Sequence, residues 1–244
     1  MLSKLKLHSQ FEEVLVNYKP SDEAIDTLNP VKIALLMGFS GSGRNSLISE
    51  LLKTEMYSFI VSDTTRSPRI NNGNLEKDGV EYNFRTEEDF LADLQHGNFL
   101  EAAIIHQQQV SGISIKEIKK ATKHQKIALA DVQIDGIDAI LKVKPNAKCI
   151  FILPPSFDTW MDRLSSRGNI SNLELRRRLA SALDELKHLD VNKYTVIIND
   201  DLSKTAGLLR RVLEDDVALP FEGSKAERVV LELEEGIGQF LEYN

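Results

Sequence analysis

The chain has 244 residues, of which 42% are hydrophobic, so it is long enough for one or two domains with a sizeable core and is neither fibrous nor disordered. Lys and Arg number 30 against 37 Asp and Glu, a net charge of −7, and the absence of a dense basic patch argues against nucleic-acid binding. The single cysteine, Cys149, excludes an internal disulfide and a multi-cysteine zinc site and favours a reducing compartment.

The first 20 residues lack a continuous apolar segment followed by a small-residue cleavage site. No stretch approaches the roughly 18 consecutive apolar residues of a membrane-spanning helix. We therefore expect a cytoplasmic protein that does not contact a membrane.

Six apolar runs have the length of β-strands, and most are separated by helical patterns, which is typical of an α/β fold. Several runs are apolar at every position, so both of their faces should be covered by helices. This pattern predicts a mainly parallel sheet in a three-layer α/β/α arrangement. The runs are residues 33–37, 57–61, 99–105, 127–132, 148–153 and 194–198.

Helix starts are indicated by capping-box spacing at three pairs: Thr86 with Asp89, Ser114 with Glu117, and Ser171 with Glu174. The polar segment 70–77 contains a glycine and has no periodicity, which predicts an exposed loop. Residues 1–30 and 215–244 are predicted to be helical extensions that either pack on the central domain or bind a partner. Apolar residues that share a face in the second extension are Val229, Leu231, Leu233, Ile237, Phe240 and Leu241.

The strongest chemical signal follows the first apolar run, where residues 38–46 read GFSGSGRNS before a helical pattern. Glycines let successive backbone N–H groups turn towards an anion, and the positive end of the next helix points to the same place. In the usual motif, a Lys reaches the β and γ phosphates and the following Ser or Thr binds Mg²⁺. Here those positions hold Arg44, which keeps the charge, and Asn45, whose amide oxygen is the candidate metal ligand. The predicted ATP-phosphate site is Gly38, Ser40, Gly41, Ser42, Gly43, Arg44, Asn45 and Ser46.

A second polar cluster follows the second apolar run, where residues 62–69 read SDTTRSPR. Arg66 and Arg69, the latter placed behind a proline, can form a bidentate clamp for a phosphate monoester that the Tyr82 hydroxyl completes. Glu101 lies on a predicted strand among apolar residues, where a buried carboxylate needs a partner. The amidine edge of guanine offers two donors at suitable spacing, and a structural ion pair is the alternative.

The order of these motifs resembles that of the guanylate kinase family, from about residue 31 to residue 213. The matching segments are GFSGSGR, VSDTTRSPR, GVEYNF, FLE, FILPPS, RLSSRG, RRRLASALDEL and VIINDD. The resemblance implies a P-loop NTPase core with a small mixed-β GMP-binding subdomain and a helical lid. Its implied boundaries are 1–30 for the first extension, 31–214 for the kinase-like domain and 215–244 for the second extension. Within that domain, 31–61 and 115–214 form the core and lid, 62–114 form the subdomain, and about 155–189 form the lid.

The resemblance also implies roles for individual residues. Those on the GMP side are Ser62, Arg66, Arg69, Tyr82, Glu101 and Asp131, with Ser62 and Glu101 reading the base; Asp131 also matches an acid near the metal. Those of the lid and the ATP side are Arg163, Arg167, Arg178 and Asn199. Phosphoryl transfer depends mostly on positioning and on neutralising the equatorial oxygens. The implied catalytic cations are therefore Arg44, Arg167 and Arg178.

The chain departs from the family pattern at three further places. Residues 131–136 read DVQIDG, where the family has Asp-x-Asp-x-Gln-Gly, and residues 110–114 read VSGIS, where the family has a Tyr-Gly-Thr/Ser segment. Ser111 or Ser114 would replace the lost hydroxyls. The loop between Arg69 and Tyr82 is longer than usual.

We expect an ATP:GMP phosphotransferase of purine nucleotide metabolism that uses Mg²⁺, forms GDP and ADP, and is slowed by its non-standard phosphate loop. One alternative is a kinase of another phosphorylated substrate, such as a ribose bisphosphate, against which Tyr82 and Glu101 argue. The other is an inactive, guanylate kinase-like scaffold module, against which Arg167 and Arg178 argue. The expected partners are small-molecule nucleotides, and a protein partner at the terminal extensions stays open.

Overall fold

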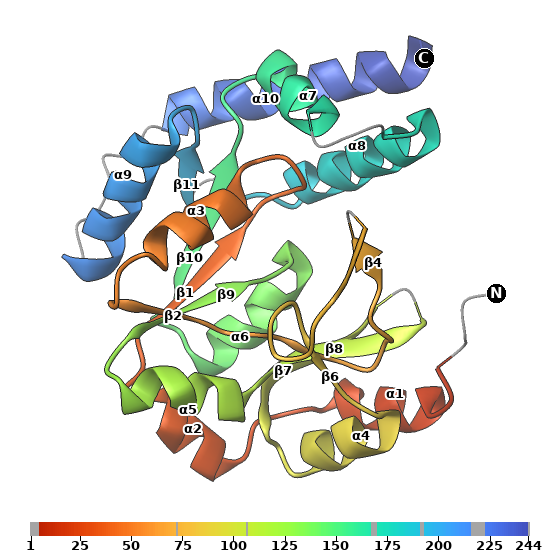
Figure 1. Cartoon of the computed structure of the whole chain (residues 1–244), viewed down its shortest axis with the longest axis vertical. Helices are drawn as coiled ribbons and strands as arrows, with labels where there is room; N and C mark the ends of the chain where they lie inside the picture. The colour runs from red at the N-terminus through yellow and green to blue at the C-terminus, as the bar shows by residue number, and fades with distance from the viewer. Residues whose placement is uncertain are drawn as a thin grey trace. The chain divides into compact units, whose positions relative to one another are not determined.

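The computed structural model describes residues 5–71, 73–105, 107–166, 170–190, 193–215 and 223–243 (Figure 1). The chain divides into two compact units. The first comprises residues 1–33, 55–130 and 135–147, and the second comprises residues 34–54, 131–134 and 148–244. Both units combine helices with parallel strand pairs, so the predicted α/β fold class is confirmed.

The second unit contains a parallel set of strands in which β10 (Lys148–Leu153) pairs with β1 (Ile33–Met37) on one side and β11 (Thr195–Ile198) on the other. All five residues of β1 are buried, as expected for a strand with both faces covered. Its helices are α3 (Arg44–Leu51), α7 (Phe157–Ser165), α8 (Asn172–Lys187), α9 (Leu202–Glu214) and α10 (Gly223–Tyr243). Helix α3 packs on α9, and α10 packs on α7 and α8.

The first unit contains β2 (Tyr57–Phe59), which pairs in parallel with β9 (Ile127–Asp131), and a four-stranded mixed sheet. That sheet has the order β6 (Asn83–Phe84), β3 (Asp63–Thr64), β8 (Gln109–Ser114) and β7 (Phe99–Ile105). Its helices are α1 (His8–Val16), α2 (Asp22–Leu28), α4 (Glu87–Gln95), α5 (Ile115–Lys123) and α6 (Ile137–Val143), with a short 3-10 helix at Ile134–Gly136.

Helix α1 shares a hydrophobic core with α4 and β7. The ring of Phe90 stacks on Phe99 at 4.4 Å and meets Phe11 of α1 edge-on at 6.1 Å. All three rings are fully buried. The buried members of this core are Leu5, Phe11, Phe90, Leu91, Leu94, Phe99 and Val110.

Strand positions agree closely with the apolar runs of the sequence. The runs at 33–37, 99–105 and 148–153 coincide with β1, β7 and β10, and the other three differ from β2, β9 and β11 by one or two residues. Cys149 is buried in β10. The hydroxyls of Thr86 and Ser171 cap their helices as expected. Ser114 begins α5, but its hydroxyl donates to Asp63 at 3.2 Å instead of capping the helix.

Two predictions about local structure are wrong. Segment 70–77 is exposed at Ile70 and Leu75, as expected, but it is not a loop throughout, because β4 (Ile70–Asn71) and β5 (Asn74–Leu75) pair as an antiparallel hairpin with Gly73 at φ +79°. Leu231 does not share the apolar face of α10, since it is 58% exposed. The buried residues of α10 are Ala226, Val229, Leu233 and Ile237, which recur at helical spacing and support the packed alternative for this extension.

In the part of the chain that the structure describes, no helix combines the length and the apolar character needed to cross a membrane.

Candidate functional site

The backbone of residues 38–46, here called the phosphate loop, requires glycine at two of its turns. Gly38 has φ +138°, and a Cβ there would lie 2.6 Å from the carbonyl oxygen of Ile152. Gly43, the N-cap of α3, has φ +95°, and a Cβ there would lie 2.1 Å from Nδ2 of Asn199. A loop that closes this tightly before a helix directs backbone N–H groups to a common point, as a phosphate cradle requires.

Side chains from α7 and β11 hold the outside of the loop. Trp160, fully buried on α7, donates from Nε1 to the carbonyl oxygen of Ser40 at 2.8 Å. Asn199, just after β11, donates from Nδ2 to the carbonyl oxygen of Ser42 at 3.0 Å. Arg163 donates from Nη2 to the carbonyl oxygen of Asn199 at 2.9 Å. The structure therefore gives Asn199 and Arg163 a supporting position beneath the loop.

Arg44 is held by two acceptors in the described structure. Its Nη1 donates to the carbonyl oxygen of Gly38 at 2.8 Å, and its Nη2 pairs with Oδ2 of Asp131 at 2.8 Å. Burial raises the pKa of Asp131, and the guanidinium of Arg44 opposes that shift. Asp131, which the resemblance grouped with the GMP side, thus lies beside the residue that replaces the usual lysine.

Two buried donors at the loop have no hydrogen-bond partner among the described residues. They are the hydroxyl of Ser42, which is fully buried, and Nε of Arg44. An unsatisfied buried donor costs about 1–3 kcal/mol, so an oxygen-rich anion that accepts both bonds would recover that energy. The loop therefore fits phosphate oxygens. Asn45 and Ser46 are exposed in the first turn of α3, where an amide oxygen and a hydroxyl can face a metal ion.

Arg178 reaches the same loop from α8. Its Nη1 donates to Oγ of Ser40 at 3.4 Å, while its Nε donates to Oε1 of Glu174 at 2.9 Å. A cation of the predicted lid thus touches the phosphate loop. Arg167 lies outside the described residues.

In the first unit, Arg66 forms a buried pair with a residue that sequence reasoning missed. Its Nη2 donates to Oε1 of Glu76 at 2.9 Å, its Nη1 donates to Oε2, and Oε2 also accepts from the backbone N–H of Arg69 at 2.8 Å. Hydrogen bonding to Glu76 raises the pKa of Arg66 and lowers that of Glu76. The ring of Tyr82 lies 4.7 Å from the guanidinium carbon of Arg66. The structure thus brings Arg66, Arg69 and Tyr82 together.

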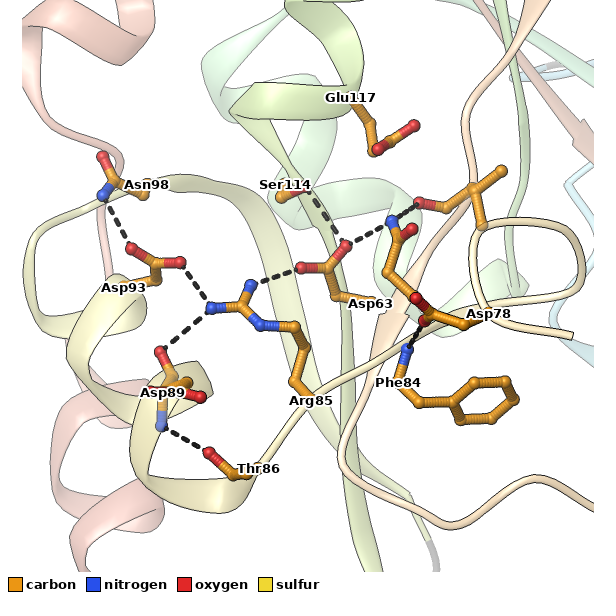
Figure 2. Close-up of polar contacts among 12 residues, drawn as sticks. Asp63, Asp78, Phe84, Arg85, Thr86, Asp89, Asp93, Asn98, Ser114 and Glu117 are labelled. Atoms are coloured by element: carbon orange, nitrogen blue, oxygen red, sulfur yellow. Dashed lines mark hydrogen bonds and ion pairs between the residues drawn. The ribbon is translucent and has the colours of Figure 1, made fainter.

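Figure 2 shows a second network that sequence reasoning missed, centred on Asp63. Asp63 is 2% exposed and accepts from Nη1 of Arg85 at 2.8 Å and from Nδ2 of Asn83 at 2.9 Å. The backbone N–H of Asn83 donates to the carbonyl oxygen of Ser62 at 2.9 Å. Ser62 and Tyr82 directly precede Asp63 and Asn83 in the chain, so this network helps to fix their backbones.

Glu101 follows a β-bulge in β7, where the register with β8 shifts between Phe99 and Glu101. Burial raises its pKa to about 7, and the backbone N–H of Ile113, which donates to it, opposes the shift. Oε2 of Glu101 lies beside Gly136, since a Cβ added at that glycine would be 3.7 Å away from it. No described cation pairs with Glu101, so a structural ion pair finds no support there.

Comparison with known proteins agrees with this arrangement. A family model described as guanylate kinase matches residues 31–216. The chain belongs to the guanylate kinase family. Over 182 residues it is 35% identical to the guanylate kinase of Helicobacter pylori, which covers 74% of this chain and 85% of that protein. It is 33% identical to the guanylate kinase of Mannheimia succiniciproducens over 203 residues, 82% and 95% of the two chains. A crystal structure of guanylate kinase from Anaplasma phagocytophilum superimposes with a TM-score of 0.55 at 26% identity, covering 76% and 86%.

The two serines expected to replace hydroxyls of the guanylate kinase family differ in burial. Ser114 is 5% exposed, and its hydroxyl is bound to Asp63. Ser111 is less buried, and its hydroxyl donates to Oγ1 of Thr64 at 2.9 Å. Among the described residues, no cluster of three or more His, Cys, Asp or Glu side chains could hold a metal ion.

Gly43→Ala tests whether the loop geometry binds nucleotide. The new Cβ would force apart the contact with Asn199 and strain a residue at φ +95°, so we expect at least about tenfold weaker binding of a non-hydrolysable ATP analogue. Isothermal titration measures this. Gly207→Ala is the matched control, because nothing lies within 4 Å of its Cβ on α9. Equal affinity of the two variants would contradict the prediction.

Proposed function

We propose that the protein transfers the γ-phosphoryl group of ATP to GMP and releases ADP and GDP. The observation that carries the proposal is the contact between Arg178 and Ser40, which brings a lid cation onto the phosphate loop in a chain of the guanylate kinase family. Phosphoryl transfer needs cations that converge on the transferring group. In this proposal Arg44, Arg167 and Arg178 are those cations.

On the ATP side, the loop from Gly38 to Ser46 would hold the phosphates, with Ser42 and Arg44 supplying the two buried donors described above. Asn45 would hold Mg²⁺, directly or through water, and the bound ion would neutralise charge on the β and γ oxygens. Arg163 and Asn199 support the loop from below, which is compatible with their proposed place beside ATP.

On the GMP side, the proposed phosphate clamp is Arg66, Arg69 and Tyr82, and the proposed base readers are Ser62 and Glu101. The ionised Glu101 would accept from N1 and N2 of guanine, donors that adenine does not present as a pair. An oxygen of the GMP phosphate attacks the γ-phosphorus in line, and the bond to the bridging oxygen of ADP breaks. No side-chain nucleophile is needed.

The proposed domain organisation follows these roles. Residues 62–114 would form the monophosphate subdomain, and about 155–189 would form the lid, within a kinase-like domain of residues 31–214. The family match over residues 31–216 supports this division. The contacts of Arg66 and Tyr82 support the first assignment, and the contact of Arg178 supports the second.

A coupled assay of ADP release tests the proposal. GMP, dGMP, AMP, UMP, CMP and a ribose bisphosphate are compared at equal concentrations with ATP and Mg²⁺. We expect the guanine nucleotides to be the fastest acceptors. Turnover of the sugar phosphate alone would mean that the protein is a kinase of another substrate class. Binding of GMP without any turnover would favour the scaffold reading.

The double change Arg44→Lys with Asn45→Ser is expected to raise the turnover number for GMP severalfold. Lysine is a compact charge that can follow the phosphoryl group, whereas Arg44 is tied to Gly38 and Asp131. A serine hydroxyl at the helix start is also a more constrained Mg²⁺ ligand than an amide on a longer arm. Steady-state kinetics with Mg²⁺ and with Mn²⁺ measure both effects. A slower double variant would mean that the arginine is adapted to its site.

A further inference from the structure

Tyr18 lies in the N-terminal segment that precedes the residues matched by the family model, yet it contacts the strand that carries Glu101. Its hydroxyl donates to the carbonyl oxygen of Phe99 at 2.7 Å and accepts from the backbone N–H of Phe99 at 2.9 Å. One hydroxyl thus satisfies both backbone groups of a residue far away in the sequence.

The position of this contact in the sheet explains why it is needed. Strand β7 is an edge strand of the order β6-β3-β8-β7, so the outer N–H and C=O groups of β7 have no neighbouring strand to pair with. Tyr18 takes the place of such a neighbour at one residue. Burial raises its pKa to about 12, so the hydroxyl keeps its proton and its role as donor.

The same contact lies at the bulge that orients Glu101. Phe99 pairs with Ser114 and Glu101 pairs with Ile113, so Leu100 is an extra residue on β7. A bulge bends its strand and can re-aim the side chains beside it, so a contact that fixes a flanking residue also limits where those side chains point. Tyr18 fixes the residue on one flank, and Glu101 is the residue on the other.

The side chain of Phe99 is held by the same N-terminal segment. Its ring stacks on Phe90, which meets Phe11 of α1, and the backbone N–H of Ser21 donates to the carbonyl oxygen of Gly97 at 3.0 Å. The N-terminal segment therefore holds the start of β7 through contacts with both its backbone and its side chains. A segment that only covered apolar surface would not need the paired hydrogen bonds of Tyr18.

We infer that residues 5–29 are a positioning element for guanine recognition, in which Tyr18 fixes the β7 bulge and so aims the carboxylate of Glu101. This inference rests on the proposed function, because it assumes that Glu101 reads the base. Tyr18 is a positioning residue, because its hydroxyl acts on Glu101 only through the backbone of Phe99.

Tyr18→Phe removes one oxygen atom and tests the inference in the full-length protein. We expect GMP binding to weaken roughly fivefold, the range for one lost pair of hydrogen bonds, with binding of an ATP analogue unchanged. Tyr194→Phe is the matched control, since Tyr194 is a largely buried tyrosine of the second unit. Unchanged GMP affinity in Tyr18→Phe, or an equal loss in Tyr194→Phe, would overturn the inference.

The choice of acceptor separates positioning from general stability. Hypoxanthine lacks the exocyclic amine of guanine, so a misaimed carboxylate loses more with GMP than with IMP. The ratio of kcat/KM for GMP to that for IMP should fall in Tyr18→Phe, and the loss should not add to that of Glu101→Gln. An unchanged ratio would make Tyr18 merely structural. If Glu101→Gln itself leaves GMP binding intact, the base-reading role fails and the inference fails with it.

A measurement on the unaltered protein needs no variant to fold. Coupling between two sites is reciprocal, so GMP bound to Glu101 should slow hydrogen exchange at the backbone amide of Phe99. The ATP analogue alone should leave that amide unchanged. Equal exchange rates at Phe99 with and without GMP would overturn the inference, whatever the kinetics of the variants.

Discussion

Arg178→Ala is expected to lower kcat for GMP by about 10³-fold, the lower end of the range for an arginine that stabilises a transferring phosphoryl group. The guanidinium reaches Ser40 of the phosphate loop and is held by Glu174 on its own helix. An interaction made only in the transition state lowers kcat and kcat/KM together and leaves the KM for GMP nearly unchanged. Steady-state rates at saturating ATP measure this split.

Arg177→Ala is the matched control for this variant. Arg177 is the preceding residue on α8, carries the same charge and is exposed. Its loss should change kcat less than twofold, within the range of an isolated surface charge. A comparable loss in both variants would mean that α8 acts only through its net charge. Full activity of Arg178→Ala would return the scaffold reading to consideration.

The second large effect is expected from Glu101→Gln, which should weaken GMP binding by about 1.5–3 kcal/mol while ATP binding stays unchanged. The carboxylate can accept from N1 and N2 of guanine, whereas the amide turns one acceptor into a donor. Titration with GMP and with an ATP analogue measures both affinities. Equal losses for the two nucleotides would make Glu101 a structural residue.

The pH dependence of GMP binding provides an independent test of the same residue. Burial raises the pKa of Glu101 to about 7, so the group is half protonated near neutral pH before GMP binds. Guanine donors favour the ionised form, so GMP affinity should rise from pH 6 to pH 8 and binding near pH 6.5 should release protons. Calorimetry in buffers of different ionisation enthalpy counts those protons. Glu101→Gln should remove the share of the release that comes from this carboxyl and leave only the share of the GMP phosphate, whose second pKa is about 6.

The raised pKa of Glu101 has the opposite effect on folding stability, which falls as the pH rises. A carboxyl whose pKa is about 7 in the folded protein and 4.5 in its ordinary state holds its proton more tightly when folded. Its contribution to stability is therefore complete below about pH 4.5 and is lost as the pH rises through 7. The ionised Glu101 side chain therefore destabilises the fold most at the pH values at which it would bind guanine best.

The sequence could predict the parts of the fold that depend on local pattern. Strands β1, β7 and β10 coincide with continuous apolar runs because strands buried on both faces have little choice of residue. The phosphate loop is equally legible, since Gly38 and Gly43 adopt conformations that other residues avoid. Thr86 and Ser171 cap helices whose starts are set within four residues.

What the sequence could not predict are the contacts between distant residues. Trp160 and Tyr18 read as an apolar helix residue and an ordinary tyrosine, and only the folded chain brings them to Ser40 and Phe99. Glu76 is one of several polar residues in its segment, and nothing in the neighbouring sequence indicates that it pairs with Arg66. Aromatic residues at helix spacing and isolated acids occur at many positions, so their type alone carries little information.

Two of the arginines proposed to bind phosphate are each paired with an acid: Arg44 pairs with Asp131, and Arg66 pairs with Glu76. Each phosphate group would therefore meet a guanidinium whose charge a carboxylate already offsets in part. The neighbouring carboxylate repels a lone sulfate or inorganic phosphate, which has no other contacts to offset that repulsion. A nucleotide brings a base and a sugar that make further contacts, so its binding can outweigh the repulsion. Under the proposed function, the paired acids would therefore favour nucleotides over small inorganic anions.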